Sequence, residues 1–156
     1  MALIKARGTQ EPSLLEQLRA RIALDRHALD LAAEEQPQLF LDVADQHVLA
    51  QSRYDASRDA LSRIDAALNR EIRSKFESEG AKVTEALLTA AVLMDLKHAE
   101  AAADVTAYKA ETDEWGALRA ALEHRKSMIR ELATLYASGY YTAGAAAGAG
   151  TKVRDV

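Results

Sequence analysis

Apolar residues recur along this chain at the three- and four-residue spacing of helices, and the spacing predicts three helical segments. The first is expected over about 13–34, because Ser13 and Glu16 have the spacing of a capping box. The pair Gln36-Pro37 predicts a break, since proline disfavours helix in the residue before it and suits a first turn. The second helix is expected over about 37–77.

Each long helix carries one stripe of residues spaced for contact with a partner helix. The stripe of the second helix, called here the first seam, follows a heptad-like alternation that is typical of coiled coils. It comprises Val43, His47, Ala50, Tyr54, Ser57, Leu61, Ile64, Leu68, Ile72 and Phe76. The second seam comprises Ala101, Val105, Tyr108, Trp115, Leu118, Leu122, Arg125, Ile129, Leu132 and Tyr136. It is weak between Tyr108 and Trp115, where Glu111 and Thr112 would occupy the contact.

Gly80 marks the turn between the two long segments, because glycine can take the left-handed conformation that ends a helix. Thr84 or a neighbour restarts the chain as a helix over about 84–138, and Asp95 could cap a fresh start inside it. That stretch is therefore one long helix, or a short helix followed by a long one.

The predicted fold is all-α, an antiparallel hairpin or bundle of long helices with coiled-coil-like seams that self-associates. Residues 13–138 are expected to form a single helical domain. A loose arm at 1–12 precedes it, and the glycine- and alanine-rich tail at 139–156 is expected to be mobile, since it has little to bury.

Composition narrows the classes of function. The chain has 156 residues, a net charge of −4 and no cysteine, so any nucleic-acid binding must rest on local rather than overall charge. No apolar run approaches the length of a membrane span, and the first residues lack the apolar stretch of a signal peptide. We therefore expect no membrane partner and a cytoplasmic location.

No constellation of catalytic residues is recognisable. A di-metal helical bundle needs paired Glu-x-x-His motifs, and the nearest match is a single Asp95-x-x-His98. Phosphate-binding glycine loops and a nucleophile elbow are also missing from the sequence. We expect a protein that is not an enzyme and that uses no metal and no cofactor.

Basic side chains on the second helix are the best candidates for function. At about 100° per residue, Arg63, Arg70 and Arg73 fall within about 80° of one another, roughly opposite the first seam. Lys75 and Lys82 follow near the turn. In an oligomer such a patch would repeat and could track a phosphate backbone. The alternative is a solvated face of mixed charge, since acidic residues share it.

A second group of basic residues lies in the last helix. It comprises Arg119, His124, Arg125, Lys126 and Arg130. Arg125 lies on the second seam itself, where an arginine can extend its charged end to water, pair across a subunit contact, or occupy a partly exposed position.

The stretch from about Leu49 to Tyr136 resembles the UvsY-type recombination mediators of bacteriophages and related small helical phage proteins. The resemblance lies in the order of features: a long helix ending in Leu68-Asn69-Arg70-Glu71-Ile72-Arg73, a short turn, then Lys82-Val83-Thr84-Glu85. An alanine-rich apolar run and a closing helix with Arg119, Arg125 and Arg130 follow.

Membership of that family would imply a ring-forming protein that binds single-stranded DNA and helps a RecA-like recombinase displace single-strand-binding protein. It would also imply the cytoplasm of a host cell as the location. On matching positions, the DNA contacts would be Arg70, Arg73, Lys75 and Lys82. Negative net charge and the diluting Glu71, Glu77 and Glu79 depart from the family pattern.

Two hypotheses of different class follow. The first is a non-enzymatic recombination mediator that binds single-stranded DNA as a homo-oligomer, in a ring or a bundle. The second is a structural or scaffolding coiled-coil protein whose seams bind protein partners, without nucleic acid. The seams favour both equally, so the basic patch decides between them.

Overall fold

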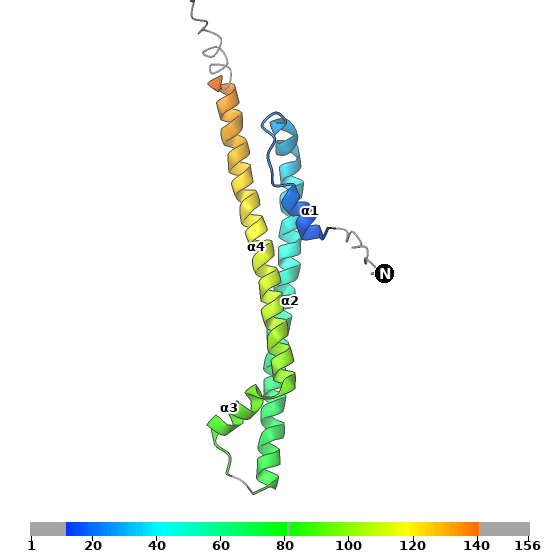
Figure 1. The fold of residues 1–156 in the computed structure, drawn as a ribbon, viewed down its shortest axis with the longest axis vertical. Helices are drawn as coiled ribbons and strands as arrows, with labels where there is room; N and C mark the ends of the chain where they lie inside the picture. The colour runs from blue at the N-terminus through cyan, green and yellow to red at the C-terminus, as the bar shows by residue number, and fades with distance from the viewer. Residues whose placement is uncertain (1–11, 81, 141–156) are drawn as a thin grey trace, which may run out of the picture. The chain divides into compact units, whose positions relative to one another are not determined.

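The computed structural model describes residues 12–80 and 82–140, and every regular element in them is helical. Four helices are present in this part of the chain (Figure 1): α1 (Leu14–Ala20), α2 (Leu29–Ser78), α3 (Glu85–Leu93) and α4 (Leu96–Ala137). The all-α class predicted from periodicity is therefore confirmed. Most of the predicted N-terminal arm and C-terminal tail lies outside the described residues, so both remain predictions.

The chain divides into two compact units, and α2 and α4 contribute to each. Unit 1 contains the chain up to Val43 and from Leu118 onward, and unit 2 contains Ala44–Ala117. Within each unit the two long helices are antiparallel, as the predicted hairpin requires. That the two units act as one domain stays a prediction.

Cross-helix contacts establish the antiparallel direction in each unit. In unit 1, Gln36 bonds to Leu122 while the earlier residue Ala32 bonds to the later residue Arg125. In unit 2, Arg53 pairs with Glu111, whereas the later residue Asp65 contacts the earlier residue His98.

The predicted cap of α1 is present, but the helix is shorter than expected. Ser13 Oγ accepts from the Glu16 amide at 3.3 Å, and the Glu16 carboxylate accepts from the Ser13 amide at 2.8 Å. These hydrogen bonds lower the pKa of Glu16. The helix ends at Ala20 rather than near residue 34. A turn follows instead, in which the Asp25 carboxylate accepts from the His27 amide at 2.8 Å. Aspartate competes for backbone donors in this way and so favours turns over helix.

The break predicted at Gln36-Pro37 is wrong, because α2 begins at Leu29 and continues through Pro37. Proline removes one backbone hydrogen bond and disfavours helix in Gln36. Gln36 is nevertheless held by tertiary contacts, since its buried amide donates to the Leu122 carbonyl at 2.8 Å. Tertiary packing therefore overrides the local preference at this position.

The turn and the restart after α2 agree with the sequence. Gly80 has a φ of 65°, the left-handed conformation expected of it. Thr84 Oγ1 accepts from the Leu87 amide at 3.3 Å and caps α3. The Asp95 carboxylate accepts from the Lys97 amide at 2.8 Å where α4 begins. Of the two alternatives for 84–138, the short helix followed by a long one is correct.

Both seams are confirmed as the contact lines. Every member of the first seam is buried or half-buried. In the second seam, only Tyr108 and Tyr136 are more than about a third exposed, at 37% and 39%. Thr112 fills the weak stretch as a buried residue, and its hydroxyl donates to the Tyr108 carbonyl at 2.9 Å. The polar residue is thus satisfied within its own helix.

Replacing Gly116 with alanine should stabilise unit 2. Gly116 lies in α4 beside the His47 imidazole, and an added Cβ would stand 3.4 Å from Nε2, an ordinary contact. Alanine is favoured over glycine inside a helix by about 1 kcal/mol. We expect Gly116→Ala to raise the melting temperature. Gly80→Ala is the control and should lower it, because Gly80 has a positive φ. A lower melting temperature for Gly116→Ala would contradict the contact geometry.

Candidate nucleic-acid interface

The five basic residues singled out from the sequence all belong to unit 2, and all are exposed. Four of them lie on the last part of α2, and the fifth lies between the turn and α3. They are Arg63, Arg70, Arg73, Lys75 and Lys82. Each charged group is therefore accessible to a ligand in solution.

Arg73 is the most constrained of the five. Its Nη2 lies 2.8 Å from Oε1 of Glu85 in the first turn of α3, and this ion pair raises the pKa of Arg73. The pair is exposed, so water and salt screen much of its energy. The sequence does not predict this pairing, because twelve residues and a turn separate the partners.

The other four differ in how they are held. Arg70 Nε donates to the Ala66 carbonyl of its own helix at 3.2 Å, which leaves the rest of the guanidinium outward. Within the described residues, Arg63, Lys75 and Lys82 make no ion pair. A phosphate could therefore bind these three without first displacing a carboxylate.

Acidic residues are as frequent as basic ones on this stretch. Between residues 58 and 85 there are six of each sign, so the region has no net charge. The acidic residues are Asp59, Asp65, Glu71, Glu77, Glu79 and Glu85. Long-range attraction of a polyanion is therefore weak in a single copy, and any phosphate contact depends on individual side chains.

A hollow of about 340 Å³ with a mixed apolar and charged lining adjoins Lys75 between α2 and α3. Its apolar lining is Ile72, Phe76, Ala91 and Met94, and its polar lining is Lys75, Glu79 and Asp95. Phe76 is half-buried there. An aromatic ring beside a lysine is a combination that proteins use to stack a base while a phosphate is held.

The α3 end of unit 2 also exposes apolar side chains. The α3 sequence is apolar almost all round, yet only Leu88 and Val92 are buried. The exposed apolar residues, called here the α3 surface, are Leu87, Leu93, Met94 and Leu96, with 45–89% of their area accessible. A helix apolar on all sides is normally covered, so this surface is suited to a protein partner.

The second basic group, in unit 1, is not uniformly accessible. Arg119 lies over the Phe40 ring at 5.7 Å, whereas Arg125 is 5% exposed. Arg125 Nη1 donates to the Ala32 carbonyl at 3.1 Å and to the Gln36 amide oxygen. Arg125 is therefore buried inside the hairpin, and the alternatives of a charged end in water or a partly exposed position are wrong. Its guanidinium pairs within its own chain. Burial lowers the pKa of Arg125.

His98, which belongs to the nearest match to a Glu-x-x-His motif, contacts a residue of the other long helix. His98 Nδ1 lies 2.7 Å from Asp65 Oδ1, across the helix pair in unit 2. Asp95 instead caps α4. The part of the chain that the structure describes contains no group of three or more residues able to hold a metal ion.

Comparisons with known proteins give no match: no protein-family model, no curated protein and no solved structure is similar to this chain. None of the helices in the described ranges is long and apolar enough to span a membrane.

Arg125 and Gln36 should behave as one unit in stability. Arg125→Leu leaves the Gln36 oxygen without its donor, and Gln36→Leu leaves a buried guanidinium with one carbonyl partner. Each single change should lower the free energy of unfolding by about 1–3 kcal/mol. The double change should cost clearly less than the sum, because it removes both buried polar groups. Urea denaturation of the four proteins measures this coupling, and additive costs would contradict it.

Proposed function

We propose that this chain is a non-enzymatic recombination mediator that binds single-stranded DNA and acts as a homo-oligomer. In this role it assists loading of a RecA-like recombinase on strands covered by single-strand-binding protein. The observation that carries the proposal is the exposure of all five candidate basic residues on one stretch of unit 2, four of which match the family's positions. The hollow beside Lys75 adds a place for a base.

The balance of charge explains why self-association belongs to the proposal. One copy offers five cations among six carboxylates, so its attraction for a strand is small. Several copies present the same side chains repeatedly to one strand, which raises the effective concentration of each further contact. Contacts would be made mainly to phosphates, so sequence preference should be weak.

Fluorescence anisotropy of a labelled single-stranded oligonucleotide tests the proposal directly. We expect binding at about 50 mM salt that falls steeply by about 200 mM, because released counterions drive such contacts. Arg70→Ala with Arg73→Ala should weaken binding at least about tenfold, since it removes two cations from each copy. The far-ultraviolet circular dichroism of this variant should match that of the parent.

The matched control is Arg53→Ala with Lys109→Ala. It removes the same charge from unit 2, but from two cations outside the five candidate residues, which pair with Glu111 and Asp113. This control should bind nearly as well as the parent. Equal losses in the two variants would assign the effect to overall charge, and no binding at low salt would overturn the proposal.

Glu85→Gln should strengthen DNA binding, because it releases Arg73 from its only ion pair among the described residues. Glu71→Gln removes the same charge from the same stretch without freeing a cation, and it serves as the control. Both should bind somewhat better than the parent, and Glu85→Gln should bind best, by about two- to fivefold. The same anisotropy assay gives the result. Equal affinities of both variants would mean that Arg73 makes no contact.

A second function, that of a scaffolding protein without nucleic acid, is favoured by the α3 surface. Exposed Leu93, Met94 and Leu96 suit an apolar protein partner rather than a phosphate backbone. Under this alternative the oligonucleotide stays unbound at low salt, and Arg70→Ala with Arg73→Ala changes neither mass nor partner binding. The anisotropy experiment therefore separates the two functions.

A further inference from the structure

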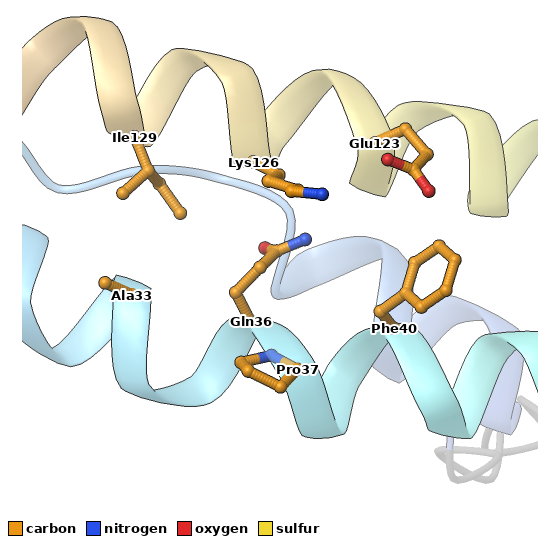
Figure 2. Close-up of a pocket in the computed structure, with 7 residues that line it drawn as sticks. All are labelled: Ala33, Gln36, Pro37, Phe40, Glu123, Lys126 and Ile129. Carbon is orange, nitrogen blue, oxygen red and sulfur yellow. The ribbon is translucent and has the colours of Figure 1, made fainter.

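Unit 1 has an open groove of about 370 Å³ between α2 and α4 (Figure 2). Residues from both helices line it: Ala33, Pro37, Phe40, Glu123, Lys126 and Ile129. In the view of Figure 2, α1 and the segment after it lie behind the helix pair. Arg21 in that segment pairs with Glu35 at 3.7 Å, and Glu35 projects about 160° away from Pro37 around α2. One side of the pair is thus covered, and the groove side is open.

The groove is more apolar than an ordinary exposed surface between two helices. Most of its lining area is carbon, contributed by Ala33, Pro37, Phe40 and Ile129. Leu41 lies about 40° from Pro37 around α2 and is 54% exposed, so it extends the apolar strip beyond the groove. A strip of this kind on a helix pair is the shape that receives another helix pair in a four-helix bundle.

Charges of opposite sign flank the groove. The α2 segment Leu29–Val43 has four acidic residues and no basic one, and Asp30 and Glu34 lie within about 60° of Pro37. These two carboxylates are called the acidic rim. On α4, Arg119 and Arg130 lie within about 40° of Lys126, and Glu123, about 60° from Lys126, is the one acidic residue of α4 in the groove lining. These three cations are called the basic rim.

We propose that this groove is an interface between two copies of the chain, related by a two-fold axis parallel to the helices. Such an axis places α2 of one copy against α4 of the other, so each acidic rim meets one basic rim and the contact occurs twice in the dimer. An axis perpendicular to the helices would place α2 against α2 and oppose carboxylates with carboxylates. The apolar strips meet in the middle, and the charged rims surround them.

The same chemistry disfavours other occupants. A nucleic-acid strand lying in the groove would gain from the basic rim but would be repelled by the acidic rim a helix away. A different protein would need the same paired pattern of charge that a second copy already has. The inference deepens the self-association in the proposed function and rests on that part of it, independently of DNA binding.

Charge reversal on the two rims tests the interface through the mass in solution. Acid-reversed protein carries Asp30→Lys with Glu34→Lys, and base-reversed protein carries Lys126→Glu with Arg130→Glu. In a dimer of either variant, residues of like charge face each other at both rim contacts. The dissociation constant of the dimer should therefore rise about tenfold or more. Sedimentation equilibrium measures that constant, and circular dichroism checks that each variant stays helical.

Two ways of combining these substitutions make the test specific. A mixture of acid-reversed and base-reversed proteins should form heterodimers, because each rim then faces an opposite charge in the partner. A chain carrying all four changes should dimerise with itself only if α2 meets α4. If the rims interacted only within one chain, mixing the two variants would not restore dimer formation. Glu100→Lys with Asp104→Lys, on exposed positions of α4 in unit 2, is the control and should leave the mass unchanged.

The outcomes separate this inference from the proposed function. A parent chain that stays monomeric at the highest soluble concentration overturns both the interface and the self-association, whatever its DNA binding. A parent that associates while both rim variants retain its mass overturns the interface alone. DNA binding that is lost in Arg70→Ala with Arg73→Ala, at unchanged mass, leaves the interface standing.

Discussion

The contact between α2 and α4 buries only one stripe of each helix, and this constraint governs the rest of the molecule. In unit 1 the stripe contains large side chains, with Leu39, Val43 and Leu122 fully buried. In unit 2 it mixes the large side chains of Leu68 and Trp115 with small ones such as Ala50 and Ser57, and the Ser57 hydroxyl bonds to its own helix. A two-helix contact of this width leaves most of each helix surface accessible. Additional apolar residues therefore remain exposed unless another helix or another molecule covers them.

Polar residues inside the contact give it a defined register. Arg125 reaches across to Ala32 and Gln36, and Gln36 reaches back to Leu122, so the hairpin in unit 1 cannot slide without breaking several buried hydrogen bonds. Apolar stripes alone tolerate shifts by a heptad, whereas a buried polar group does not. The Nε of Arg125 has no partner in the described residues, so burial of this side chain lowers stability while it specifies alignment.

Features that depend on neighbouring residues could be predicted from the sequence, and those that depend on distant residues could not. The seams follow from periodicity, and the caps at Ser13, Thr84 and Asp95 follow from side chains that bond within a few residues. The helix through Pro37 could not be predicted, because the contact that holds Gln36 comes from a residue 86 positions away. The exposure of Arg63, Arg70 and Arg73 follows from their angular position, but the pairing of Arg73 with Glu85 depends on where the turn brings α3.

The exposed charges are arranged differently in the two units, and the difference has physical consequences. In unit 2 the signs alternate along α2, so the field beyond the first water layers largely cancels and a ligand is recognised by single contacts. In unit 1 the charged residues of the α2 segment Leu29–Val43 are all acidic, whereas those of α4 are mainly basic, with Glu123 and Glu131 as the exceptions. A helix whose charges share one sign repels its own copy. It is attracted to the basic rim of α4, which every chain carries. In the proposed dimer, charge therefore selects which helices meet before the apolar strips come into contact, and the strips then supply most of the binding energy.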